Sequence, residues 1–132
     1  MSSKNFEDLE IWKHARDLAN TIYKLSKSDK FSKDFGLRDQ IRRAAVSIPA
    51  NIAEGFERGT NAEFKHFSMI SRGSCGELRT HLYIAEAVGY LDKDVARSFI
   101  AECMEISSML TGLSKTLKPP NPSTKPNESH RV

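Results

Sequence analysis

The chain has 132 residues, of which 39% are apolar and 28% charged. This composition fits one domain with a hydrophobic core and excludes a disordered or fibrous protein. No stretch approaches the roughly 18 consecutive apolar residues of a membrane-spanning helix, and the polar start Met-Ser-Ser-Lys-Asn is unlike a secretory signal peptide. We therefore expect a cytoplasmic protein with no membrane partner.

The net charge of +3 is unevenly distributed. Residues 1–114 contain 16 basic and 16 acidic side chains, so the excess lies after residue 114. Within the neutral part, residues 24–43 hold seven basic and three acidic side chains, and we call them the basic segment. Its charge suits a polyanion partner, but also a solvated surface or a charge-steered subunit contact. The candidate nucleic-acid-binding residues are Lys24, Lys27, Lys30, Arg38, Arg42 and Arg43.

The first predicted helix follows residue 5. Apolar residues recur at intervals of four and three from Ile11 to Leu25, which predicts a helix packed nearly parallel to its neighbours. Asn5 followed by Asp8 offers an N-cap arrangement for its start. The polar residues 26–32 are predicted to form a loop.

The second predicted helix has an apolar face that contains a proline. Leu37, Ile41, Ala45, Ile48, Ile52 and Phe56 share this face. Pro49 has no N–H for the carbonyl of Ala45 and crowds it, at a cost of about 3 kcal/mol unless packing compensates. We expect a kinked helix near Pro49. The alternative is a break, with Ser47 capping a new helix.

A polar stripe lies beside this apolar face at helical spacing. It consists of Gln40, Arg43, Ser47, Asn51 and Glu54. Two interpretations remain open. The stripe either satisfies the carbonyl freed by Pro49 and fixes the helix register, or it forms a contact between subunits.

The third predicted helix starts after Gly59, a residue type that commonly ends helices. Thr60 and Glu63 have the spacing of a capping box for its start, and the helix should run to about residue 88. Its predicted inner positions are Phe64, Phe67, Ser71, Ser74, Leu78, Leu82 and Ala85. Gly73 and Gly76 predict close approach of another backbone, because each helical glycine otherwise costs about 1 kcal/mol relative to alanine.

The fourth predicted helix completes the fold. Its inner positions are Val95, Phe99, Cys103, Ile106, Leu110, Leu113 and Leu117. Four amphipathic helices with short connections predict an all-α fold, an antiparallel up-down-up-down four-helix bundle over residues 1–118. The proline-rich residues 119–132 are predicted to be a disordered tail.

Motifs for catalysis or metal binding are weak. Glu63 and His66 form a single Glu-x-x-His pair, whereas a di-iron bundle repeats this motif. Cys75 and His81 are six residues apart along one helix, which is too far for a nucleophile and its base. Cys75 and Cys103 are predicted to be reduced packing residues. We expect neither metal nor cofactor, and no enzymatic activity.

The string from Gly36 to Gly55 (GLRDQIRRAAVSIPANIAEG) resembles the signature of the four-helix-bundle proteins encoded in 23S rRNA intervening sequences. Phe6–Trp12, Glu63–Phe67 and Arg72–Leu78 resemble three other family segments. The likeness covers roughly residues 6–117. One departure precedes the signature, where Phe31-Ser32 and Asp34 stand in place of a Phe-Pro and a Glu.

The resemblance implies a small bacterial bundle that assembles into a ring, described for the family as a pentamer, without known catalysis. Its relatives include accessory proteins of diversity-generating retroelements, which associate with a reverse transcriptase and its RNA. The label "S23 ribosomal protein" reflects where some of the genes lie.

Two function hypotheses follow. The first is a non-enzymatic homo-oligomer that binds RNA or other nucleic acid through a basic face. The second is an oligomeric scaffold for a protein partner, for example a reverse transcriptase-like enzyme. The sequence contains no RNA-recognition motif and no array of aromatics for base stacking, which argues against sequence-specific readout of single strands.

Overall fold

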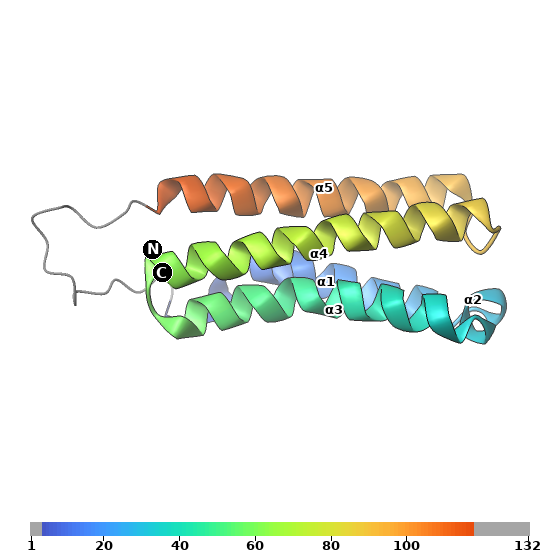
Figure 1. The fold of residues 1–132 in the computed structure, drawn as a ribbon, viewed down its shortest axis with the longest axis horizontal. Helices are drawn as coiled ribbons and strands as arrows, with labels where there is room; N and C mark the ends of the chain where they lie inside the picture. The colour runs from blue at the N-terminus through green and yellow to red at the C-terminus, as the bar shows by residue number, and fades with distance from the viewer. Residues whose placement is uncertain (1–3, 118–132) are drawn as a thin grey trace, which may run out of the picture.

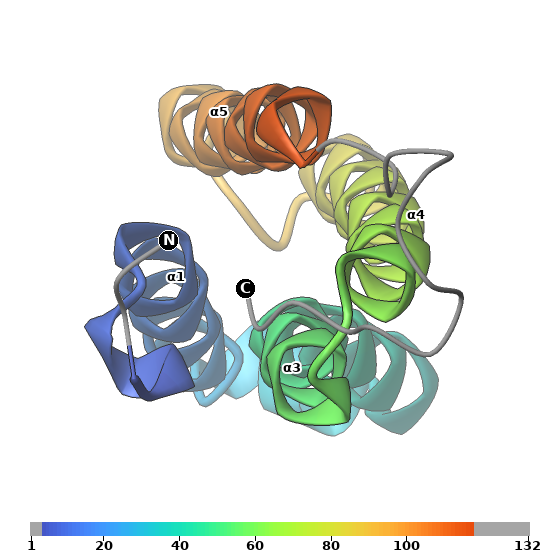
Figure 2. The same ribbon diagram turned by 90° about the vertical axis from the view of Figure 1, so that its left-hand side faces the viewer.

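The computed structural model describes residues 4–117, and these form a bundle of helices. Four long helices run alternately in opposite directions (Figure 1) and surround a shared core (Figure 2). The element bounds are η1 Phe6–Asp8, α1 Glu10–Leu25, α2 Asp29–Lys33, α3 Phe35–Arg58, α4 Asn61–Ala87 and α5 Lys93–Thr116. No strand occurs among the described residues. The predicted antiparallel four-helix bundle is confirmed, whereas the tail predicted for residues 119–132 lies outside the described range.

The core consists of apolar side chains from all four long helices. Its fully buried members include Ile22, Ile41, Ile48, Ile52, Phe64, Leu78, Leu82 and Leu110. The pairs α3–α4 and α4–α5 pack most extensively, and α1 and α5 pack least. One predicted inner position of α5 is wrong, because Val95 is exposed and its neighbour Ala96 is buried. Phe99 is half-buried and packs against the core beside the buried Ile100. The buried Ala96, Cys103, Leu110 and Leu117 are each seven residues apart, whereas the predicted positions departed from this repeat at the start of the helix.

The start of the chain and the stretch after α1 differ from prediction. Asn5 makes no side-chain cap, and α1 follows Leu9, whose backbone is extended and whose side chain is buried. Burial of Leu9 therefore fixes the start of α1. The loop predicted for residues 26–32 instead contains most of α2. Phe31 is fully buried and its ring centroid lies 5.5 Å from that of Tyr90, so a single aromatic anchor holds this polar segment.

The middle of the chain follows the predicted boundaries. α3 continues without interruption through Pro49, so the alternative with a second helix capped by Ser47 is wrong. The size of the bend near Pro49 stays a prediction. Gly59 ends α3 in the left-handed conformation, with φ of 86°, which glycine adopts at no steric cost. The side chain of Thr60 accepts a hydrogen bond from the Glu63 backbone N–H at 3.1 Å.

The close backbone approach predicted at Gly73 and Gly76 occurs elsewhere. A Cβ atom added at either glycine would meet no atom within 4 Å outside its own helix turn. At Gly55 of α3, an added Cβ would lie 2.9 Å from Cβ of Phe67 and 3.2 Å from Cα of Phe64. Gly55 therefore permits the tight contact between α3 and α4.

We expect Gly55→Ala to destabilise the protein, because forcing a methyl group against a backbone costs about 1–3 kcal/mol. Gly112→Ala is the matched control, since Gly112 is a helical glycine with open space around it. That control should stabilise the fold by up to about 1 kcal/mol through helix propensity. Urea unfolding at one protein concentration measures both. A Gly55→Ala variant as stable as the control would contradict the proposed close contact.

The two cysteines are buried in the core, as predicted. Burial, as the largest cause, raises the pKa of the Cys75 thiol to about 11 and that of Cys103 to about 12. Because only the thiolate reacts, we expect negligible alkylation by iodoacetamide at pH 8 in the folded protein. Full modification should follow addition of denaturant. Rapid alkylation of either cysteine without unfolding would contradict this assignment.

Candidate nucleic-acid interface

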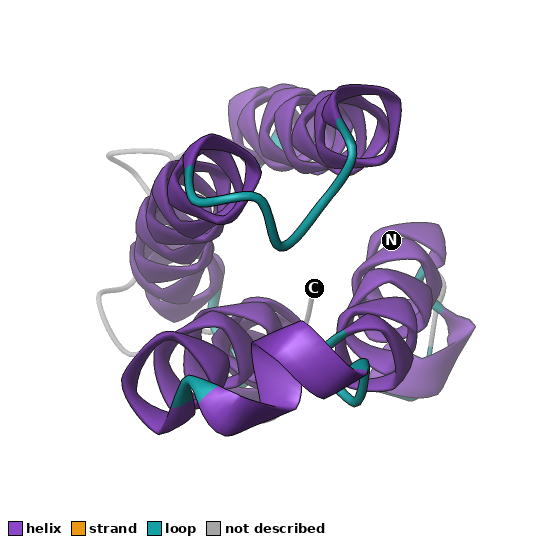
Figure 3. Cartoon of the chain, turned by 90° about the vertical axis from the view of Figure 1, so that its right-hand side faces the viewer, coloured by secondary structure: helices purple, strands orange, loops and turns teal. Residues whose placement is uncertain are grey.

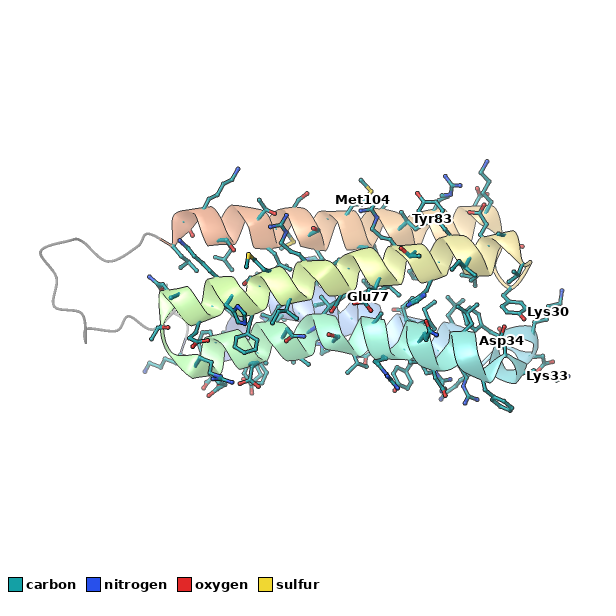
Figure 4. All side chains as sticks on the ribbon, viewed as in Figure 1. Lys30, Lys33, Asp34, Glu77, Tyr83 and Met104 are labelled. Carbon is teal, nitrogen blue, oxygen red and sulfur yellow. The ribbon has the colours of Figure 1, made fainter. Side chains whose placement is uncertain are left out.

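The basic segment occupies one end of the bundle, which we call the basic end. It runs from the last turn of α1 through α2 into the first turns of α3. Figure 3 views the bundle from this end, where α2 lies between the end of α1 and the start of α3. Lys24, Lys27 and Lys30 are exposed. Figure 4 shows Lys30 and Lys33 projecting from the same end.

Arg38 is held in place by its neighbours on α2 and α3. Its Nη1 atom donates to the backbone oxygen of Ser32 at 3.2 Å, and its Nη2 atom lies 3.0 Å from Oδ1 of Asp39. Its guanidinium carbon stands 4.8 Å from the centroid of the Phe35 ring, within range for a cation–π interaction. The ion pair with Asp39 partly neutralises Arg38. Phe35 itself is 65% exposed.

Arg42 joins α3 to the end of α1. Its Nε atom donates to Oγ of the buried Ser26 at 2.6 Å, and its guanidinium carbon stands 4.8 Å from the ring centroid of Tyr23. Arg43 is exposed and lies one turn before Ser47, which contacts α4. Because i and i+4 residues share a helix face, Arg43 belongs to the α4 side of α3. The structure thus gathers five of the six candidate residues and sets Arg43 apart.

The Asp34 carboxylate has a structural role at this end of the bundle. One oxygen accepts the backbone N–H of Leu37 at 3.1 Å and caps α3. The other accepts the Tyr90 hydroxyl at 3.0 Å, and this hydrogen bond, as the largest cause, raises the pKa of Tyr90. The contact joins the α4–α5 turn to the basic end.

Sequence reasoning missed the two aromatic side chains at this end. Tyr23 and Phe35 are exposed, and each carries an arginine over its ring. The available signal was position, because Phe35 lies inside the basic segment and Tyr23 immediately precedes it. Tyr23 borders the apolar stripe of α1, and the periodicity of the sequence does not distinguish such an edge position from an exposed one.

The polar stripe divides into two parts. Ser47 Oγ lies 2.8 Å from Ser74 Oγ on α4, and Asn51 Nδ2 donates to the backbone oxygen of Ser47 at 2.8 Å. Ser71 Oγ of α4 donates to the backbone oxygen of Ile48 at 2.8 Å. These bonds fix the register of α3 against α4, but they reach the carbonyls of residues 47 and 48 rather than that of residue 45.

The outer part of the stripe is exposed. It comprises Gln40, Arg43 and Glu54. Glu54 pairs with Arg58, with 2.9 Å between Oε2 and Nε. Whether this part meets another subunit stays a prediction.

A second surface feature lies on the side of α4 that faces away from the core. We call it the α4 outer face, and it comprises the exposed residues Met69, Ile70, Gly73, Gly76, Tyr83, Ile84 and Val88. These positions share one side of the helix in two groups, residues 69–76 and residues 83–88, with the exposed polar residues Glu77 and Thr80 between them. Figure 4 marks Tyr83 on this helix, and the Arg97 guanidinium carbon stands 5.0 Å from its ring centroid.

An acidic groove of about 280 Å³ lies between α1 and α5. Its lining comprises His14, Asp17, Leu18, Thr21, Glu102, Glu105 and Ile106. Partial burial first, and the charge of Glu105 second, raise the pKa of Glu102. Carboxylates here disfavour a phosphate backbone. Within residues 4–117, no three His, Cys, Asp or Glu side chains are grouped so as to hold a metal ion.

None of the described helices is long and apolar enough to cross a membrane.

No curated protein matches the chain. Its structure is similar to the crystal structure of a protein of unknown function from the S23 ribosomal protein family of Bacteroides thetaiotaomicron VPI-5482. The TM-score is 0.73 and the identity 24%, with 80% of this chain and 98% of the other covered. This likeness shows a shared fold. The sequence profile of the 23S rRNA-intervening sequence proteins matches residues 7–112, most of the chain, and the protein therefore belongs to the 23S rRNA-intervening sequence protein family.

Proposed function

We propose that this protein is a non-enzymatic homo-oligomer that binds RNA or another nucleic acid through the basic end of the bundle. The observation that carries the proposal is the cluster of four exposed lysines, Lys24, Lys27, Lys30 and Lys33. None of the four forms an ion pair with a residue in the described range. Their ammonium groups are therefore available to phosphates, and such contacts bind nucleic acid without regard to sequence.

A test of this proposal reverses three of these charges. We expect a variant with Lys24, Lys27 and Lys30 changed to Glu to lose most of its affinity for a generic single-stranded RNA at low salt. Each phosphate contact contributes about −0.7 to the slope of log affinity against log salt. The slope should therefore become less steep by about 2. Fluorescence anisotropy across a salt series measures both quantities.

The matched control places the same charge change at the opposite end of the bundle, with Lys4, Lys65 and Lys115 changed to Glu. This variant should keep the wild-type slope and most of the affinity. Arg42 is left intact in both variants because it bonds α3 to Ser26. Absence of salt-dependent binding by the wild type, or equal binding by the two variants at unchanged oligomeric mass, would contradict the proposal.

Self-association is supported by the α4 outer face. Large apolar side chains at helical spacing, with open glycines between them, leave room for another helix to approach closely. Exposed apolar surface commonly marks a contact with another protein. In a ring, the local charge of each basic segment would be repeated around one assembly.

We expect Ile84→Glu on the α4 outer face to lower the oligomeric mass toward the 14.9 kDa of one chain. Val46→Glu is the control, because Val46 has similar exposure but lies on α3. Light scattering at micromolar concentration measures both. A wild-type monomer would contradict the proposed oligomer, and a five-fold mass would support the pentamer that the family resemblance implies.

Charge reversal at Glu54 tests the outer part of the polar stripe in the same assay. A lower mass would place Glu54 between subunits. An unchanged mass would restrict the stripe to the bracing of α3 against α4.

The second candidate function is an oligomeric scaffold for a protein partner, such as a reverse transcriptase-like enzyme. The α4 outer face favours it as well, since the same apolar stripe suits a partner helix. Purification from the native cell, with identification of bound RNA and bound protein, separates the two functions. Protein capture that depends on Ile84, without bound nucleic acid, would favour the scaffold.

A further inference from the structure

The basic end exposes aromatic rings, and the binding of phosphates alone does not require them. Phe35 is the most exposed of the large apolar residues in the described range, at 65%. It is the first residue of α3 and stands beside the unpaired Lys33. Removing an aromatic ring from water is favourable, so a partner that covers Phe35 gains apolar contact in the middle of a cationic surface.

The side chain of Arg38 is already ordered beside Phe35. Its hydrogen bond to Ser32 and its ion pair with Asp39 hold the guanidinium over the ring. Only 25% of the Arg38 side chain is exposed, compared with 65% of Phe35. The arginine therefore covers part of the ring and leaves the remainder open. A planar partner can stack there without first ordering either side chain, which reduces the entropic cost of binding.

The same arrangement is repeated one turn along α3. Arg42 stands over Tyr23, which is 42% exposed, and its bond to Ser26 holds it there. Arg38 and Arg42 are four residues apart and so share a face of α3, about 6 Å apart along its axis. The basic end thus presents two exposed aromatic rings, each with an arginine held over it, in the same part of the chain as the exposed lysines.

From this geometry we propose that the basic end binds unpaired nucleotides, with bases stacking on Phe35 and Tyr23 while the lysines contact the phosphates. The proposal rests on the nucleic-acid function inferred above and specifies its ligand class. A duplex hides the faces of its bases in its own stack, whereas a single strand or loop offers them. Stacking on aromatic side chains tolerates any base, so the site selects unpaired structure rather than sequence.

A charge-matched comparison of probes tests this ligand class. The probes are labelled oligothymidylate of 15 nucleotides, an abasic oligomer with the same number of phosphates, and oligouridylate of the same length. The full chain should bind the thymidylate at least about fivefold more tightly than the abasic oligomer, since each stacked base contributes about 5- to 150-fold. The uridylate also offers unpaired bases and should likewise bind at least about fivefold more tightly than the abasic oligomer, whereas binding no tighter than the abasic oligomer would contradict stacking that tolerates any base.

Phe35→Ala should reduce affinity for the thymidylate by about fivefold or more and leave affinity for the abasic oligomer unchanged. Phe35→Trp should restore binding, because it retains an aromatic face. Met104→Ala is the matched control, since Met104 is a half-exposed apolar residue on α5, and it should change neither affinity. Circular dichroism checks that each variant is folded.

The possible results separate this inference from the function on which it rests. Salt-dependent binding of both oligomers with equal affinity, or an unchanged affinity of Phe35→Ala for the thymidylate, would overturn base stacking and leave phosphate binding intact. Failure to bind any probe at low salt would overturn both.

Discussion

The close approach of α3 and α4 is the constraint on which the rest of the molecule depends. Gly55 leaves no room for a methyl group against Phe64 and Phe67, and the hydroxyls of Ser47 and Ser74 meet between the two helices. Small side chains permit this distance, and hydrogen bonds satisfy the hydroxyls of Ser47, Ser71 and Ser74 that lie between the helices. The rotation of α3 is fixed as a result. That rotation directs Arg42 toward the end of α1 and Arg38 toward α2.

The basic end is consequently a rigid part of the fold rather than a loop carrying charge. Phe31 packs in the core against Tyr90, and Tyr90 in turn donates to the carboxylate that caps α3. Arg42 bonds to the buried Ser26 across the α1–α3 contact. Three elements distant in sequence therefore meet at this end. A surface fixed in this way loses little entropy on binding, which suits a site that recognises a repeating polymer.

The long helices were predictable from the sequence because their signal is repeated many times. A seam such as the one from Ile11 to Leu25 specifies a helix through five or more positions, and Gly59 with Thr60 marks a boundary by chemistry that acts locally. α2 was missed because its burial depends on one residue, Phe31. A single apolar residue in a polar stretch has no periodicity, and only the tertiary contact with Tyr90 shows that it belongs to the core.

The interface was predictable in charge but not in shape. The lysines could be identified by counting, and Phe35 and Arg38 are three residues apart in one helix. Tyr23 and Arg42, however, belong to different helices, and only the packing of α1 against α3 brings them together. The glycines illustrate the same limit. Helix propensity indicates that a mid-helix glycine is costly, but the sequence does not show which glycine a close contact requires. At Gly55 the close contact is with α4 of the same chain, whereas Gly73 and Gly76 face open space.

The positions of the two surfaces bear on how an assembly would use them. The α4 outer face runs along the side of the bundle, and the basic segment lies at its end (Figure 1). A two-fold axis perpendicular to the long axis of the bundle would produce an isologous dimer, with the two basic ends at opposite ends of the assembly. Cyclic symmetry about an axis along the bundle would instead bring every basic end to the same rim. Only the cyclic arrangement sums their fields over one ligand, and such summation strengthens the attraction of a polyanion. In the proposed oligomer, binding of a single-stranded nucleic acid across several subunits would require the cyclic arrangement, so the proposed function depends on the geometry of a contact at α4 as well as on its existence.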